Sequence, residues 1–182
     1  NLVTVGAGGT ASAVAGIPFY SADTSSIYTT DVSGTDDTAS GNSAYGYQAM
    51  DAITTGDNNT AMGFGALGAN TTGTRNLAIG TEAYKASDTE NDNIAIGYRA
   101  MQTDTAGGTR NVAIGNYAGD AITSGDDNTL LGHTAGGAIA AGVANTFIGQ
   151  EAGLTTAAGG SNTAVGNLAL RLNATTDDNT AV

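Results

Sequence analysis

One eight-residue phrase recurs along this chain and constrains its fold more than any other feature. It is first complete as Asn42-Ser-Ala-Tyr-Gly-Tyr-Gln-Ala49, returns seven more times, and begins a ninth copy at the end of the sequence. The spacing between leading asparagines is 17 residues at every step except one, which is 18. A period this strict predicts a repeat architecture, in which each repeat is one structural unit stacked on the next. The nine leading asparagines are Asn42, Asn59, Asn76, Asn93, Asn111, Asn128, Asn145, Asn162 and Asn179.

Each repeat contains a short apolar run that ends at a glycine. With the asparagine as position 0, positions 1 to 3 are rich in β-branched and other apolar residues, which favour a strand. A glycine in register after such a run indicates a positive φ or a close backbone approach. We therefore predict a strand at positions 1 to 3 that ends at position 4, which is Gly46, Gly63, Gly80, Gly97, Gly115, Gly132, Gly149 and Gly166.

Positions 2 and 3 of this strand are both apolar. Successive strand side chains point to opposite faces, so both faces of the strand are expected to be covered. The interior of one coil covers a single face. The second face therefore predicts a partner chain or a second layer.

A second apolar stretch follows in each repeat. Position 7 is alanine throughout, position 8 is often large and position 10 is mostly alanine. We expect a second strand there, opposite the first across a thin core, so that each coil has two strands of about five residues and two turns. The fold class predicted is all-β, a parallel β-solenoid (β-roll) of about eight coils over residues 42–182. Residues 1–41 do not keep the register and are interpreted as an irregular cap or attachment segment.

Stacked coils place equal positions above one another and so predict side-chain ladders. The asparagines at position 0 would form an amide ladder. The residues just before them carry alternating charge, as Arg75, Asp92, Arg110 and Asp127. We expect exposed pairs of this kind to fix coil register more than stability.

Composition excludes several classes of partner. With a net charge of -12, the surface would repel nucleic-acid phosphates and anionic membranes. There is no cysteine, no apolar stretch of membrane-spanning length and no leader pattern at the first residues. The chain begins without methionine and stops within a repeat, which suggests cuts in a longer protein or joints in a polymer.

The sequence offers little sign of catalysis or of a cofactor. Acidic turns could collect Ca²⁺, although they match no known calcium loop, and solvated carboxylates are the preferred interpretation; these residues are Asp57, Asp92, Asp126, Asp127, Asp177 and Asp178. His133 is the single histidine, so no histidine-based triad or zinc cluster can be assembled within one chain. We predict that the chain is not an enzyme. Four aromatic residues at variable positions could contact a host-surface glycan or protein receptor, but packing between chains is favoured for them: Tyr47, Phe64, Tyr98 and Tyr117.

The phrase Asn-[Thr/Val/Leu/Ile]-Ala-Ile-Gly-x-x-Ala resembles the head repeats of YadA-like trimeric autotransporter adhesins. It is even more similar to the Asn-Thr-Ala-[Ile/Val]-Gly repeats of bacteriophage tail fibres. The resemblance covers residues 42–182 and implies a left-handed β-roll that associates as a homotrimer. It implies a structural fibre in a virion appendage that supports host attachment. Two other hypotheses stay open: the head of a bacterial surface adhesin, and a self-polymerising extracellular filament in which Asn179-Thr-Ala-Val182 stacks on Asn1-Leu-Val-Thr-Val5 of the next subunit.

Overall fold

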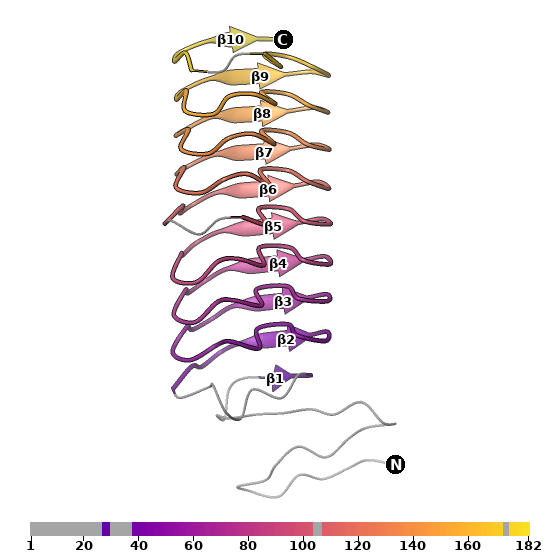
Figure 1. Cartoon of the computed structure of the whole chain (residues 1–182), viewed down its shortest axis with the longest axis vertical. Helices are drawn as coiled ribbons and strands as arrows, with labels where there is room; N and C mark the ends of the chain where they lie inside the picture. Colours follow the sequence, from indigo (N-terminus) through magenta and orange to yellow (C-terminus); the bar gives the residue numbers. More distant parts are fainter. Residues whose placement is uncertain (1–26, 30–37, 104–106, 173–174) are drawn as a thin grey trace, which may run out of the picture.

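The chain folds as a stack of coils that share one parallel sheet (Figure 1). The computed structural model describes residues 27–29, 38–103, 107–172 and 175–182. Within these ranges ten strands lie in chain order, each paired in parallel with the strand of the coil before it. The strands are β1 (Ile27–Tyr28), β2 (Ser43–Tyr45), β3 (Thr60–Met62), β4 (Leu77–Ile79), β5 (Ile94–Ile96), β6 (Val112–Ile114), β7 (Thr129–Leu131), β8 (Thr146–Ile148), β9 (Thr163–Val165) and β10 (Thr180–Ala181).

The predicted parallel β-solenoid is confirmed, and so is its register. Equal positions face each other across every step, as in Ala78 opposite Ala95, even where the spacing between asparagines is 18 residues. The sheet also extends below Asn42, because β1 pairs with β2. Of the predicted segment 1–41, the structure describes only residues 27–29 and 38–41.

Glycine ends the strand because no side chain fits there. The position 4 glycines have φ values from 129° to 142°, a region that L-residues rarely adopt. In the seven glycines that have another coil above them, an added Cβ would lie 2.3 to 2.6 Å from the carbonyl oxygen of the next coil's glycine. The coils therefore approach closely at this corner.

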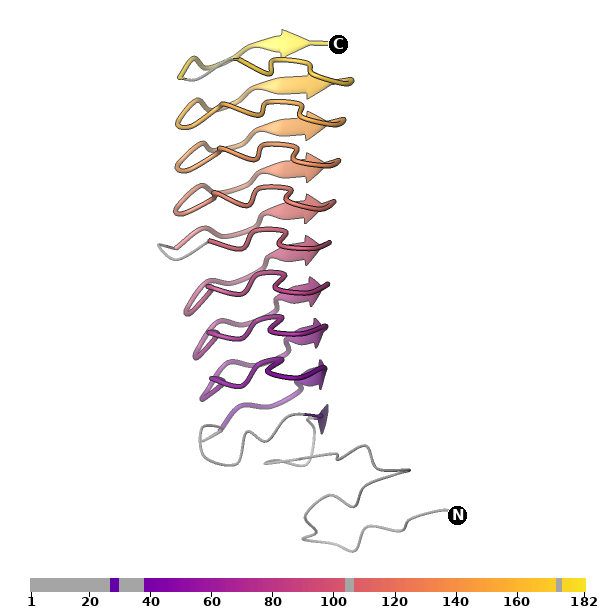
Figure 2. The same cartoon turned by 45° about the vertical axis from the view of Figure 1, so that its right-hand side comes forward.

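The prediction of two five-residue strands per coil is wrong. Each complete coil has one strand of three residues, and the second apolar stretch is a series of turns (Figure 2). Its backbone enters the left-handed region at positions 6 and 8, for example φ 56° at Glu82 and φ 50° at Tyr84. Left-handed residues cannot continue a strand. The turns still bond from coil to coil, as when the Tyr84 N–H donates to the Ala100 carbonyl at 2.9 Å.

The core lies between the strand and these turns. Positions 2 and 7 are buried, mostly as alanine, which confirms a thin core. Position 8 is buried in most coils. Position 10 is at most half-buried. The core instead contains the residue at position 11, for example Ile53, Ile122 and Ile139.

Core volume is exchanged between positions 2 and 8. Where position 8 is large, as in Met50, position 2 is alanine. In two of the three coils with glycine at position 8, a larger residue at position 2 fills the space: an added Cβ at Gly153 would lie 2.2 Å from the Phe147 ring, and one at Gly136 would lie 2.7 Å from Leu130. In the third coil position 2 is Ala113, and an added Cβ at Gly119 would lie 2.8 Å from Ile122 and from Leu130 of the next coil.

Candidate functional site

The nine asparagines at position 0 lie one above another along the stack. The backbone N–H of each asparagine after Asn42 donates to the Oδ1 of the asparagine one coil earlier, at 2.8 to 3.0 Å. From Asn42 to Asn162, each Nδ2 donates to a carbonyl in the last turn of its own coil at 2.7 to 2.9 Å, at position 14 or, in the 18-residue coil, position 15. Amide-to-amide bonds between side chains join the last four steps, from Asn111 to Asn179. Asparagine is suited to this place because it accepts from one coil and donates within its own.

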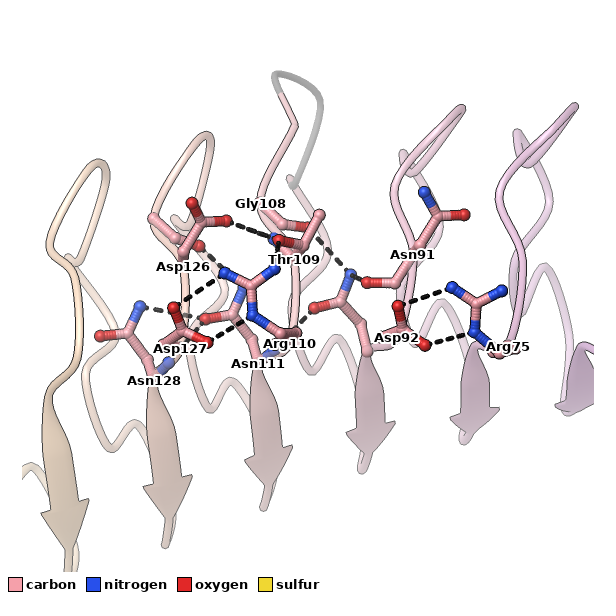
Figure 3. Close-up of polar contacts among 12 residues, drawn as sticks. Arg75, Asn91, Asp92, Gly108, Thr109, Arg110, Asn111, Asp126, Asp127 and Asn128 are labelled. Carbon is pink, nitrogen blue, oxygen red and sulfur yellow. Dashed lines mark hydrogen bonds and ion pairs between the residues drawn. The ribbon is translucent and has the colours of Figure 1, made fainter.

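The four charged residues of the predicted charge ladder form two separate pairs (Figure 3). Arg75 binds Asp92 through Nε at 2.5 Å and Nη2 at 2.8 Å. Arg110 binds Asp127 in the same way at 2.6 and 2.9 Å. Hydrogen bonding by each guanidinium holds the pKa of the paired aspartate below its usual range. Both pairs are exposed, so each contributes little to stability.

A third ladder, which the sequence reading missed, lies one residue earlier at each turn. The Oδ1 of Asp126 accepts from the N–H and the hydroxyl of Thr109 at 2.7 and 2.9 Å (Figure 3). Ser40 with Asp57 and Thr74 with Asn91 repeat this arrangement. The alternation of Ser or Thr with Asp or Asn at a 17-residue spacing was the signal available in the sequence.

The acidic turns considered for Ca²⁺ mostly have protein partners. Asp57 and Asp126 bond to the turn one coil earlier, as does Asp177, whose Oδ1 accepts from the Gly160 N–H at 2.7 Å. Asp92 and Asp127 bind arginines, and Asp178 is exposed. Among the described residues, no three His, Cys, Asp or Glu side chains are grouped so that they could hold a metal ion.

A second charged network, also missed, centres on Glu82. Its carboxylate accepts from Lys85 and Arg99, both at 2.7 Å, and from Gln102 at 3.2 Å. These bonds lower the pKa of Glu82. With Arg171 bound to Glu151, all five basic residues of the chain are ion-paired.

The aromatic residues at variable positions form two groups. Tyr47 and Phe64, 71% and 43% exposed, stack with ring centroids 5.9 Å apart. Tyr98 and Tyr117 meet edge to face at 5.3 Å, and the His133 ring lies 6.1 Å beyond Tyr117. The His133 Nδ1 lies 2.9 Å from the Thr134 hydroxyl.

The outward face of the sheet is apolar along position 3, and none of the other residues that the structure describes covers it. Positions 1 and 3 point away from the core, and the side chains of Tyr45, Met62, Leu131 and Val165 at position 3 are 37% to 53% exposed. In the central coils both positions are aliphatic and half-buried, as in Ile94 and Ile96 of β5. At the lower end a shallow groove of about 140 Å³ runs between Ile27, Tyr45 and Met62.

No family model, no curated protein and no solved structure matches this chain. None of the described residues forms a helix long and apolar enough to span a membrane.

Two buried polar atoms on the described part of the chain have no hydrogen-bond partner, the Asn70 Oδ1 and the Thr156 hydroxyl. Both residues occupy position 11, which is isoleucine in three of the eight complete coils and polar in the others. An unbonded buried acceptor is costly. Among the described core residues, the polar side-chain atoms that lack a hydrogen bond are therefore at position 11.

Proposed function

We propose that this chain is a shaft segment of a trimeric fibre, in a bacteriophage tail fibre or another virion appendage, and that it supports host attachment. The observation that carries the proposal is the uncovered apolar face of the sheet. Monomeric proteins rarely expose a continuous apolar patch of large size. Here the patch follows a whole column of the repeat, from Tyr45 to Val165.

A second copy of the chain fits this face because the face is regular. Position 3 is apolar in all eight complete coils and position 1 is aliphatic in β4 to β6, and a parallel sheet is normally covered on both sides. The resemblance of the repeat to adhesin-head and tail-fibre repeats implies three copies around a common axis and a left-handed coil. At about 4.8 Å per coil, the eight complete coils would give a rod roughly 4 nm long.

Receptor contact, in this proposal, takes place away from the sheet face. The exposed pair Tyr47 and Phe64 and the group around Tyr117 lie beyond the glycine corner that ends each strand. A host-surface glycan or protein is the expected partner. Placement of the protein on a virion or a cell surface follows from the same proposal.

Charges on the sheet face test the proposal. Ile96→Glu combined with Ile114→Glu would bury two carboxylates in the chain–chain contact, and burial of unpaired charge is strongly unfavourable. We expect the particle to fall to the mass of one chain by light scattering while the far-ultraviolet circular dichroism is unchanged. A matched variant, Thr81→Glu with Ser161→Glu, adds the same charge at exposed positions outside the face and should keep the native mass. If both variants have the mass of the unmodified protein, the face is not an interface.

A further inference from the structure

Position 14 of the repeat is closed to side chains by the coil that follows. It is occupied by Gly56, Gly73, Gly125, Gly142 and Gly159, and an added Cβ at any of these would lie 2.3 to 2.7 Å from the carbonyl oxygen at the same position of the next coil. Contacts that short do not occur in folded proteins, so a substitution there would push the coils apart. Thr176 also occupies this position, but no further coil in the sequence follows it.

Glu90 breaks this rule in the middle of the rod. It stands at position 14 of its coil, and it is only 3% exposed. The coil that follows, from Asn93 to Asn111, is the one with 18 residues. The two irregularities of the repeat are therefore neighbours in the stack.

The coils are slightly further apart at this turn. The Arg110 N–H donates to the Asn91 carbonyl at 3.3 Å, whereas the seven equivalent bonds at other steps are 2.9 to 3.1 Å long. The extra residue thus coincides with a looser contact above Glu90.

The Glu90 carboxylate accepts hydrogen bonds from backbone N–H groups whose equivalents in the coil below donate to a carbonyl of the next coil. In the coil below, the N–H groups of Thr71, Thr72 and Gly73 donate to the carbonyl of Asp88 in the next coil. In Glu90's own coil, the equivalent N–H groups of Asp88 and Thr89 donate to its Oε2 at 2.7 and 3.0 Å. Its Oε1 accepts from the Gly107 N–H of the longer coil at 3.1 Å.

We propose that Glu90 and the extra residue of the next coil are a matched pair that fixes the order of the coils. The longer coil makes room for the Glu90 side chain, and the Glu90 carboxylate supplies the hydrogen-bond acceptor that a coil carbonyl supplies elsewhere. Nearly identical coils can pair in a shifted register. A coil with glutamate at position 14 accepts only the 18-residue coil above it, which excludes such a shift at this step.

A double-mutant cycle tests the pairing. Deletion of Gly107 makes the longer coil 17 residues and brings its turn against Glu90; we expect the melting temperature to fall by about 5 °C or more. Glu90→Gly alone removes three hydrogen bonds and should lower the melting temperature less. With both changes, the step is regular, and we expect the melting temperature to rise above that of the deletion alone. If the deletion has the same effect in the unmodified protein as in the Glu90→Gly variant, the two features are independent and the proposal fails.

Transfer of the pair to another step provides a second test that does not depend on the first deletion folding. Gly125→Glu alone places a Cβ 2.4 Å from the Gly142 carbonyl oxygen and should destabilise the protein. Insertion of one glycine before Gly142 should recover stability in the Gly125→Glu background and lower it in the unmodified background. If the insertion lowers the melting temperature equally in both backgrounds, it does not make room for glutamate and the proposal is contradicted.

Discussion

At the scale of the residue, the identity of position 0 follows from its bonds in two directions. Asn111 accepts from the Asn128 N–H at 2.9 Å and donates to the Gly125 carbonyl at 2.7 Å, and it is fully buried. An aspartate could not donate, and a serine could not reach both partners. The asparagine joins its own turn to the next coil, which explains why the type of residue is constant in all nine copies.

Substitution of Asn111 by alanine should therefore be costly. It leaves the Asn128 N–H and the Gly125 carbonyl without their partner, at about 1 to 3 kcal/mol for each buried group. We expect the free energy of unfolding to fall by about 3 kcal/mol, as measured by denaturant titration. Asn167→Ala is the control because Asn167 is exposed and its side chain makes a long hydrogen bond of 3.4 Å to Gln150. An equal, small effect of both substitutions would show that the ladder does not stabilise the stack.

At the scale of the element, one half of each coil could be predicted and the other could not. The run that ends at a glycine, such as Ile94-Ala-Ile-Gly97, predicts its strand because β-branched residues favour a strand. The glycine marks the end of the strand, where the coils approach closely. The turns after it contain non-glycine residues in the left-handed region, such as Arg99 and Met101. Neither residue type is typical of positive φ, so nothing in their identity indicated that a strand could not form. The stacking of coils imposes this backbone geometry, and no single residue type in the turn indicates it.

The ladders show the same limit. The 17-residue period was enough to bring together the nine asparagines and the pairs of Arg75 with Asp92 and Arg110 with Asp127. Of the basic partners of Glu82, Arg99 lies one period away and could have been found in the same way, whereas Lys85 lies within the same coil. Which acid binds which base depends on side-chain reach across the turns, and the period alone does not determine it.

The exchange of core volume between positions 2 and 8 can be tested in one coil. Phe147→Ala should cost about 3 to 5 kcal/mol because it leaves a cavity beside Gly153. Addition of Gly153→Met to this variant rebuilds the arrangement of Ala44 with Met50 and should recover most of the loss in a thermal melt. Gly153→Met in the unmodified protein should instead destabilise it, since its Cβ would meet the Phe147 ring at 2.2 Å. Additive effects of the two substitutions would contradict the exchange.

At the scale of the whole molecule, the stack has one long face that the described part of the chain leaves uncovered. The core is thin and mostly alanine, so each coil buries little apolar area of its own. The aliphatic ridges of β4 to β6 add apolar surface that the other described residues leave half-buried. Repeat proteins gain stability from such interfaces between neighbours as well as from each repeat. Association through this face would thus stabilise the rod as well as build a fibre.

The mass of the soluble particle, measured by light scattering across a dilution series, is the most direct test of whether three chains associate through the sheet face. For the proposed trimer, we expect a particle of three times the 17.8 kDa chain mass that persists on dilution. Rods whose mass grows with concentration would indicate end-to-end stacking in place of the trimer. A particle of one chain mass at every concentration would leave the apolar face uncovered and contradict the proposed trimer.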